Sequence, residues 1–240
     1  MVFNASLKSK GQGIFTSIGG ATTTIADTNG LYSSFSSNSL NLNKRGTVVF
    51  SASLKSGGSG IFTSIGGVTT TIASSQPAEF FNDFALNDRG TVVFDASFFN
   101  PALTQWLRDE LLIESGGMTT TIADTSGAFG SFYPGLNINN RGTVAFEATL
   151  KGGGFGIFTG PDPVTDKVIA TGDSLFGSTV TALSFTHKGL NNRNQLVFYA
   201  ALADGNQVIV RANPESAPEP KSVSSSKGSN ARIRGVSGNE

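Results

Sequence analysis

The chain has 240 residues, in which 17 Lys and Arg balance 17 Asp and Glu, and charged residues make up only 14% of the total. This balance gives no electrostatic reason to expect nucleic acid or an anionic membrane surface as a partner. The lack of cysteine excludes disulfides and thiolate metal sites. No window approaches the roughly 18 consecutive apolar residues of a membrane span, and the N-terminus lacks the basic and apolar regions of a signal peptide.

One segment recurs along the chain: an Asn-x-x-Gly turn followed by a run in which apolar residues alternate with others. The motif phenylalanines, spaced by 47, 44, 52 and 52 residues, are Phe3, Phe50, Phe94, Phe146 and Phe198. A period of roughly 40–50 residues is typical of propellers and repeat arrays. The turn residues that frame each motif are Asn43 and Gly46, Asn87 and Gly90, Asn139 and Gly142, and Asn191 and Asn194.

Each repeat contains four runs that we expect to be strands. In the first repeat these are the run with Phe3, a run over 13–20 that closes on Gly-Gly, a threonine-rich run over 22–26 and a looser run over 35–42. Runs rich in β-branched residues and bounded by Gly are typical of strands joined by tight turns. Four short antiparallel strands are the content of one propeller blade.

The sequence therefore predicts an all-β fold, a propeller-like array of four-stranded antiparallel blades in an incomplete ring or arc. A β-sandwich or a solenoid is the alternative. We expect a tandem β-repeat domain over residues 1–212, with units at about 1–43, 44–87, 88–139 and 140–191 and a half unit at 192–212. Residues 213–240 are rich in Ser, Gly, Asn and charge, which predicts a disordered tail.

The alternation also predicts which side chains are buried. In a strand, residues i, i+2 and i+4 share a face, so Val48, Phe50 and Ala52 form one apolar face. The Ala that recurs at the third position predicts a crowded layer. In the turns, Asn can bond its own backbone two residues on, and Gly supplies positive φ without steric cost. Asn194, which replaces this Gly in the last copy, tolerates the same conformation.

One segment departs from the repeat, because the connection that follows Phe98 is longer than its counterparts. Asn100 is a suitable helix cap and Pro101 suits a first helical position. Leu103, Trp106 and Leu107 follow at i, i+3 and i+4. We therefore expect a short helical turn packed on the rim of the domain.

The repeat resembles the Asn-x-x-Gly-x-x-Ala-Phe (NxxGxxAF) tandem repeat of exported bacterial proteins often called choice-of-anchor proteins. Residues 139–146 match this pattern fully, and the resemblance covers residues 1 to about 212. Residues 217–220, Ala-Pro-Glu-Pro, resemble the start of the sorting tail called PEP-CTERM, although its apolar span does not follow. The resemblance implies an exported or cell-surface protein without an assigned activity, whereas this chain lacks a signal peptide and an anchor.

The residues that commonly carry chemistry are sparse. His187 is the only histidine, and in an expected loop it is best explained as a surface or packing residue. Asp27, Asp124 and Asp173 follow the third strand of their repeats, where Asx turns explain them. No Asp-x-Asp-x-Asp calcium loop is present. We expect no catalytic residue, cofactor or metal.

A binding surface is a sharper hypothesis. The residue after each motif phenylalanine varies in chemistry while its neighbours do not, and stacked repeats would bring these positions to equivalent places. The alternative is that they fill wet gaps between blades. The positions are Asn4, Ser51, Asp95, Glu147 and Tyr199.

The function expected is that of a non-enzymatic exported or surface repeat protein, an interaction scaffold for a protein or glycan. Open strand edges would allow self-association. One alternative is a propeller hydrolase or lectin with a central carboxylate site, where Asp95 and Glu147 would converge with another acid. Another is an inactive fragment of a longer repeat protein.

Overall fold

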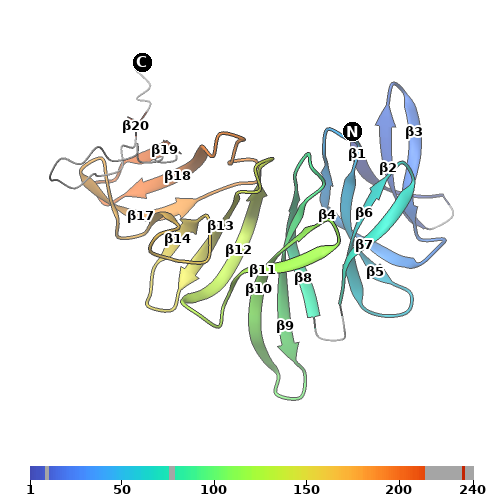
Figure 1. Ribbon diagram of the computed structural model, residues 1–240, viewed down its shortest axis with the longest axis horizontal. Helices are drawn as coiled ribbons and strands as arrows, with labels where there is room; N and C mark the ends of the chain where they lie inside the picture. Colours follow the sequence, from blue (N-terminus) through green and yellow to red (C-terminus); the bar gives the residue numbers. More distant parts are fainter. Residues whose placement is uncertain (9–10, 76–78, 214–233, 236–240) are drawn as a thin grey trace, which may run out of the picture.

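The computed structural model describes residues 1–8, 11–75, 79–213 and 234–235 (Figure 1). Within these ranges the chain forms strands, turns and bends but no helix, so the all-β prediction is confirmed. It follows that this part of the chain holds no helix that could cross a membrane.

The strands form five antiparallel sheets within the described residues, numbered here in chain order. Sheet 1 consists of β1 (Val2–Ser6), β2 (Gln12–Ile18) and β3 (Ala21–Asp27). Sheet 2 consists of β4 (Tyr32–Leu42), β5 (Val48–Leu54), β6 (Ser59–Ile65) and β7 (Val68–Ser74). Sheet 3 consists of β8 (Glu79–Leu86), β9 (Val92–Asn100), β10 (Gln105–Ser115) and β11 (Met118–Asp124).

Sheet 4 consists of β12 (Phe129–Ile138), β13 (Val144–Leu150), β14 (Phe155–Phe158) and β15 (Lys167–Ala170). Sheet 5 consists of β16 (Ser174–Leu175), β17 (Ser178–Ser184), β18 (Leu196–Leu202), β19 (Gln207–Ala212) and β20 (Arg234–Gly235). In every sheet, strands that follow one another in the chain are hydrogen-bonded neighbours. The sheets themselves follow one another in chain order along the long axis, with sheets 1 and 5 at opposite ends (Figure 1).

The sheets are offset by one strand from the predicted units. The looser run that we placed at the end of each unit is the first strand of the next sheet, as β4 pairs with β5. The cause is the Asn-x-x-Gly turn, which is a hairpin: the Asn43 amide donates to the Thr47 carbonyl at 3.0 Å and the Gly46 amide to the Asn43 carbonyl at 3.2 Å. A hairpin turn pairs the strands on its two sides, so the chain changes sheet at the connection before the looser run.

The helical turn predicted near Leu103, Trp106 and Leu107 is wrong. Residues 101–104 form a turn, and Trp106 lies in β10, paired with Phe99 of β9. Aromatic residues on both strands favour this extended hairpin over one turn of helix. The predicted disorder of residues 213–240 lies mostly outside the described residues, but Arg234 and Gly235 form β20 against β19.

Each sheet has a phenylalanine face, which carries the motif phenylalanine, and a reverse face. The reverse face of each sheet packs on the phenylalanine face of the next, and this arrangement forms the four hydrophobic clusters. Ile14 and Ala26 of sheet 1, for example, pack with Phe50 and Phe62 of sheet 2. The motif phenylalanines of the four later sheets are at most 2% exposed. The predicted burial of the phenylalanines is confirmed, and their rings are buried between neighbouring sheets.

The recurrent alanine occupies a crowded layer, as predicted. Ala52 faces Gly60 across the β5–β6 ladder. A Cβ atom added to Gly60 would lie 2.7 Å from Cζ of Phe62 and 2.8 Å from the Ala73 carbonyl oxygen. The small pair therefore makes room for the Phe62 ring, which is 5% exposed. A larger residue at either position would force this ring out of its packed place.

The motif asparagines link sheets 2, 3, 4 and 5 in series. Within the turn, Oδ1 of Asn43 accepts hydrogen bonds from the amides of Arg45 at 3.0 Å and Thr47 at 2.9 Å. Its Nδ2 group donates to the carbonyl of Asn87, 44 residues later, at 3.0 Å. Asn87 donates to Asn139 and Asn139 to Asn191 in the same way, each at 3.0 Å. We call this series the asparagine ladder.

The fourth residue of each turn has the positive φ that the motif predicts. Gly46, Gly90 and Gly142 have φ values of 85°, 92° and 88°, and Asn194 has a φ of 59°. Asparagine is among the few non-glycine residues that adopt this conformation readily. The substitution in the last copy therefore preserves the turn.

We predict that Asn87→Ala destabilises the protein by about 1–3 kcal/mol, because it removes a hydrogen bond between sheets and leaves a buried carbonyl without its donor. Urea unfolding followed by circular dichroism measures the change. Asn191→Ala is the matched control: Asn191 makes the same turn bonds, but its Nδ2 donates to Gln195 Oε1, on an exposed part of the same turn. Equal losses in the two variants would show that the ladder contributes nothing beyond the turns.

Candidate functional site

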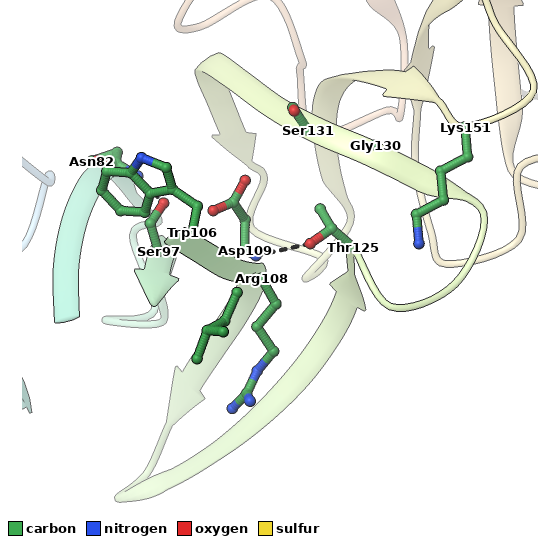
Figure 2. A pocket seen from close by; sticks show the side chains of 10 residues that line it. Asn82, Ser97, Trp106, Arg108, Asp109, Thr125, Gly130, Ser131 and Lys151 are labelled. Atoms are coloured by element: carbon green, nitrogen blue, oxygen red, sulfur yellow. Dashed lines mark hydrogen bonds between the residues drawn. The ribbon is translucent and has the colours of Figure 1, made fainter. Parts of the chain in front are cut away.

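A cavity of about 570 Å³ lies between sheets 3 and 4 (Figure 2). We call it the Trp106 cavity. Sheet 3 and the residue that follows β11 supply most of its lining, and sheet 4 with the residue after β13 supplies the rest. The lining residues are Asn82, Ser97, Trp106, Leu107, Arg108, Asp109, Thr125, Gly130, Ser131 and Lys151.

The extended β9–β10 hairpin places the aromatic side chain of the cavity. Trp106 packs against Phe80 and Phe99, with ring centroids 5.6 and 5.2 Å away. Despite these two contacts, Trp106 remains 57% exposed. A large aromatic surface that stays open to solvent beside a cavity is available for a ligand.

A polar group forms another wall of the cavity. Asn82 lies at an irregularity of β8, between Phe81 and Phe84, where the register with β9 shifts. Its Nδ2 donates to Ser97 Oγ at 2.7 Å and to Asp95 Oδ2 at 3.2 Å. The bulge turns Asn82 towards the gap between the sheets, because an extra residue re-aims the side chains around it.

Charged side chains of both signs surround the same space. The Arg108 guanidinium lies 4.3 Å from the centroid of the Phe98 ring, and its Nε donates to Glu110. The Asp109 amide donates to Thr125 Oγ1 at 2.9 Å, the bond drawn in Figure 2. Lys151 Nζ donates to the Ser126 carbonyl at 3.1 Å. The lining thus offers donors and acceptors to a neutral polar ligand.

Asp95 lies behind this wall and is 7% exposed. Burial raises its pKa to about 7; the hydrogen bond from Asn82 opposes the rise, and the charges of Asp109 and Asp83 add to it. Its Oδ1 atom is buried and finds no hydrogen-bond donor among the described residues. Near neutral pH this carboxyl is therefore divided between its charged and neutral forms.

Glu147 occupies the same position in sheet 4 and is 6% exposed. Burial raises its pKa to about 7, and a hydrogen bond from the Phe185 backbone opposes the rise. Glu147 faces the connection between β17 and β18, whereas Asp95 faces the gap between sheets 3 and 4. The two acids therefore lie in successive gaps and do not converge on a central carboxylate site.

The five predicted surface positions are distributed in the same way. Asn4 lines a cavity of about 640 Å³ beside Phe35 and Leu40 of sheet 2, and Ser51 lines one of about 230 Å³ beside Phe81 and Asn82 of sheet 3. Asp95 and Glu147 are buried, and Tyr199 lies half-buried on the reverse face of sheet 5. These positions are equivalent in the repeat but lie in separate gaps, so they form no shared surface.

Two of the other acids behave as the sequence predicts. Asp27 Oδ1 accepts from the Asn29 amide at 2.8 Å and Asp124 Oδ1 from the Ser126 amide at 2.7 Å, which are Asx turns. Asp173 instead binds Lys167 Nζ and the Ala170 amide. In the part of the chain that the structure describes, no group of three or more His, Asp or Glu side chains gathers to hold a metal ion.

His187 is 53% exposed at its side chain, and its Nε2 lies 3.8 Å from Asp83 Oδ1. Asp83 also accepts hydrogen bonds from the amides of Gly135 at 2.9 Å and Leu136 at 3.0 Å. This carboxylate thus ties sheet 3 to sheet 4 and lies near a loop of sheet 5. The contact gives His187 a structural neighbour, in keeping with the sequence interpretation.

The matched family is described as a Family of unknown function (DUF7453), and the match spans residues 68–216. The chain belongs to this family. No curated protein matches the chain. The matched residues begin with β7, extend past the end of β19 and include every residue that lines the Trp106 cavity.

Sequence reasoning missed Asn82, Arg108 and the cavity itself. The available signals were the single tryptophan of the chain and the longer connection that follows Phe98. Both mark the β9–β10 hairpin, but its strand conformation was needed to place Trp106 beside sheet 4.

We predict that Asp95→Asn changes stability in a pH-dependent way. The folded-state pKa of about 7 lies above the ordinary value of 3.8, so the folded protein binds the proton more tightly and loses stability as pH rises through this window. An amide cannot ionise, so the variant should match the parent protein near pH 4 and exceed it by about 1–3 kcal/mol at pH 8. Urea unfolding at several pH values measures this difference.

Asp88→Asn is the opposing control. The hydrogen bond from Asn140 is the main reason why the pKa of Asp88 is lowered. The ionised Asp88 carboxylate therefore stabilises the folded protein at neutral pH, and this stabilisation is lost as pH falls through the lowered pKa. This variant should lose stability at neutral pH relative to acid pH. A pH-independent difference for Asp95→Asn would contradict the assignment of a raised pKa.

Proposed function

We propose that the chain is a non-enzymatic binding scaffold that holds a carbohydrate in the Trp106 cavity. The observation that carries the proposal is a 57% exposed indole beside a hydrogen-bonding wall. Sugar rings present C–H faces that pack on an aromatic plane and hydroxyl groups that both donate and accept. A cavity of about 570 Å³ also lies within the range of roughly 300–1,000 Å³ usual for ligand sites.

The polar lining favours a neutral, hydroxyl-rich ligand. Asn82, Ser97, Thr125 and Ser131 are uncharged, and the charges of Arg108, Asp109 and Lys151 are of both signs. A strongly anionic or cationic ligand would meet a like charge on one side. A sugar avoids this cost and can use the carboxylate and the cations as hydrogen-bond partners.

Binding without hydrolysis is supported by the placement of the acids. Glycosidases commonly use two carboxyl groups on either side of the scissile bond. Asp109 is the one carboxylate among the described residues that line the cavity, and Asp95 lies behind Asn82 with its Oδ1 covered. This arrangement favours the lectin alternative over the hydrolase.

For the setting, we propose an exported or cell-surface protein whose sheets form part of a propeller-like arc. The NxxGxxAF-like repeat supports the exported or cell-surface location. The same pair of faces packs at each of the four junctions, which supports the propeller-like arc. A row of similar sheets presents its gaps to one environment, and side chains in the gaps can vary without a change in the scaffold.

A glycan microarray probed with the fluorescently labelled protein tests the proposed function, followed by calorimetry with the glycans that bind. We expect Trp106→Ala to weaken binding at least about tenfold, since stacking on the indole is lost. Phe176→Ala is the control, because Phe176 is also exposed, at 51%, but lies in the turn between β16 and β17, away from the cavity lining. We also expect no new reducing ends when the bound glycan is incubated with the protein.

Unchanged binding by Trp106→Ala would place the ligand elsewhere. Absence of binding to every glycan on the array would reject the carbohydrate proposal, and release of reducing ends would support the hydrolase alternative instead.

A further inference from the structure

The reverse face of sheet 5 exposes apolar residues at two positions whose equivalents in the preceding three sheets are buried. One register position, opposite the varied residue of each repeat, is occupied by Ile14, Ile61, Leu111, Ile157 and Ile209. The first four are at most 1% exposed, whereas Ile209 is 65% exposed. Val197 repeats this contrast: its equivalents Val49, Val93 and Ala145 are 0% exposed, and Val197 is 44% exposed. This face therefore has the composition of an interface.

The phenylalanine face of sheet 1 has the complementary composition. Phe3 stacks on Phe15 with a centroid distance of 5.7 Å and an interplanar angle of 28°. Phe50 and Phe62 stack at 5.6 Å and 27° in sheet 2, where the reverse face of sheet 1 covers them. Phe50 is 0% exposed, whereas Phe3 and Phe15 are only partly buried. The aromatic pair is thus already arranged as it is in a completed junction.

We propose that these two faces bind each other in neighbouring copies of the chain. The reverse face of sheet 5 in one copy would pack on the phenylalanine face of sheet 1 in the next, through Ile209 and Val197 against Phe3 and Phe15. A second copy fits these faces because all four junctions within the chain join a reverse face to a phenylalanine face. The end faces are the two halves of one more such junction.

The two end faces can meet only if a second copy of the chain takes part. Sheets 1 and 5 lie at opposite ends of the chain, so one molecule cannot bring its own end faces together in this conformation (Figure 1). The contact joins two different surfaces and is therefore heterologous. Such contacts form a closed ring where the rotation allows it and an open filament where it does not.

A closed ring and an open filament share one requirement: each copy needs both an intact reverse face on sheet 5 and an intact phenylalanine face on sheet 1. A charge introduced on either face should weaken association, because the junction would remove it from water at a cost in free energy. Ile209→Asp alters the reverse face of sheet 5, and Phe3→Asp alters the phenylalanine face of sheet 1. Each variant retains the other face.

Sedimentation velocity of the full chain over a wide range of concentration should show self-association. Each single variant should weaken it at least about tenfold. An equimolar mixture of the two variants should form a one-to-one dimer and no larger species, because only one matching pair of faces remains intact. Val164→Asp is the control: Val164 is 80% exposed in the connection before β15, and this variant should associate like the parent chain.

Circular dichroism checks that each variant folds, and Ala5→Asp replaces Phe3→Asp if the latter does not. Cysteine cross-linking is a second measurement, because the chain has no native cysteine. Chains with Ile209→Cys should form disulfide dimers with chains that carry Phe3→Cys. A monomeric parent chain at all concentrations, or a variant mixture that remains monomeric, would overturn the proposal. Association of Phe3→Asp as strong as that of the parent would also overturn it.

Discussion

The asparagine ladder determines how the sheets are arranged. One side-chain amide carries out two tasks: its oxygen closes the turn, and its nitrogen donates to the carbonyl of the next turn, as in Asn87. Aspartate lacks the donor, and serine is too short to serve both partners. Because consecutive ladder residues belong to consecutive sheets, the motif that defines the repeat in sequence is also the link that sets the sheets side by side.

The ladder and the phenylalanine faces together explain where cavities occur. The aromatic rings fill the inner part of each junction, and the varied position after the motif phenylalanine lies beside them. A small residue such as Ser51 leaves an open gap there, whereas Glu147 fills it and is buried. Sheet 3 adds the β9–β10 hairpin, which carries Trp106 out beside the gap. The repeat thus supplies a set of similar gaps, and local departures from it create the one with an aromatic wall.

The sequence predicted the parts of this fold that depend on local chemistry. Positive φ at Gly46 and Asn194 and the burial of Phe50 follow from residue type and alternation alone. The assignment of strands to sheets failed because a four-run period does not say which run begins a sheet. The i, i+3, i+4 pattern around Trp106 failed because three apolar residues also fit a strand whose partner carries Phe99. The cavity depends on a bulge and on a neighbouring sheet, which no local pattern encodes.

The register position that holds Asp95 in sheet 3 and Glu147 in sheet 4 holds an uncharged side chain in sheet 5. Burial of these two acids raises their pKa values to about 7, so the junctions that cover them form with uptake of protons near neutral pH. Tyr199 occupies the position in sheet 5 and brings a phenol, which has no carboxylate to desolvate. A junction formed there between two copies would bury Ile209 and Val197 without the desolvation of a carboxylate at this register position. Association through this face would therefore bury no carboxylate at this register position, as in the junctions that hold Asn4 and Ser51 and unlike those that cover Asp95 and Glu147.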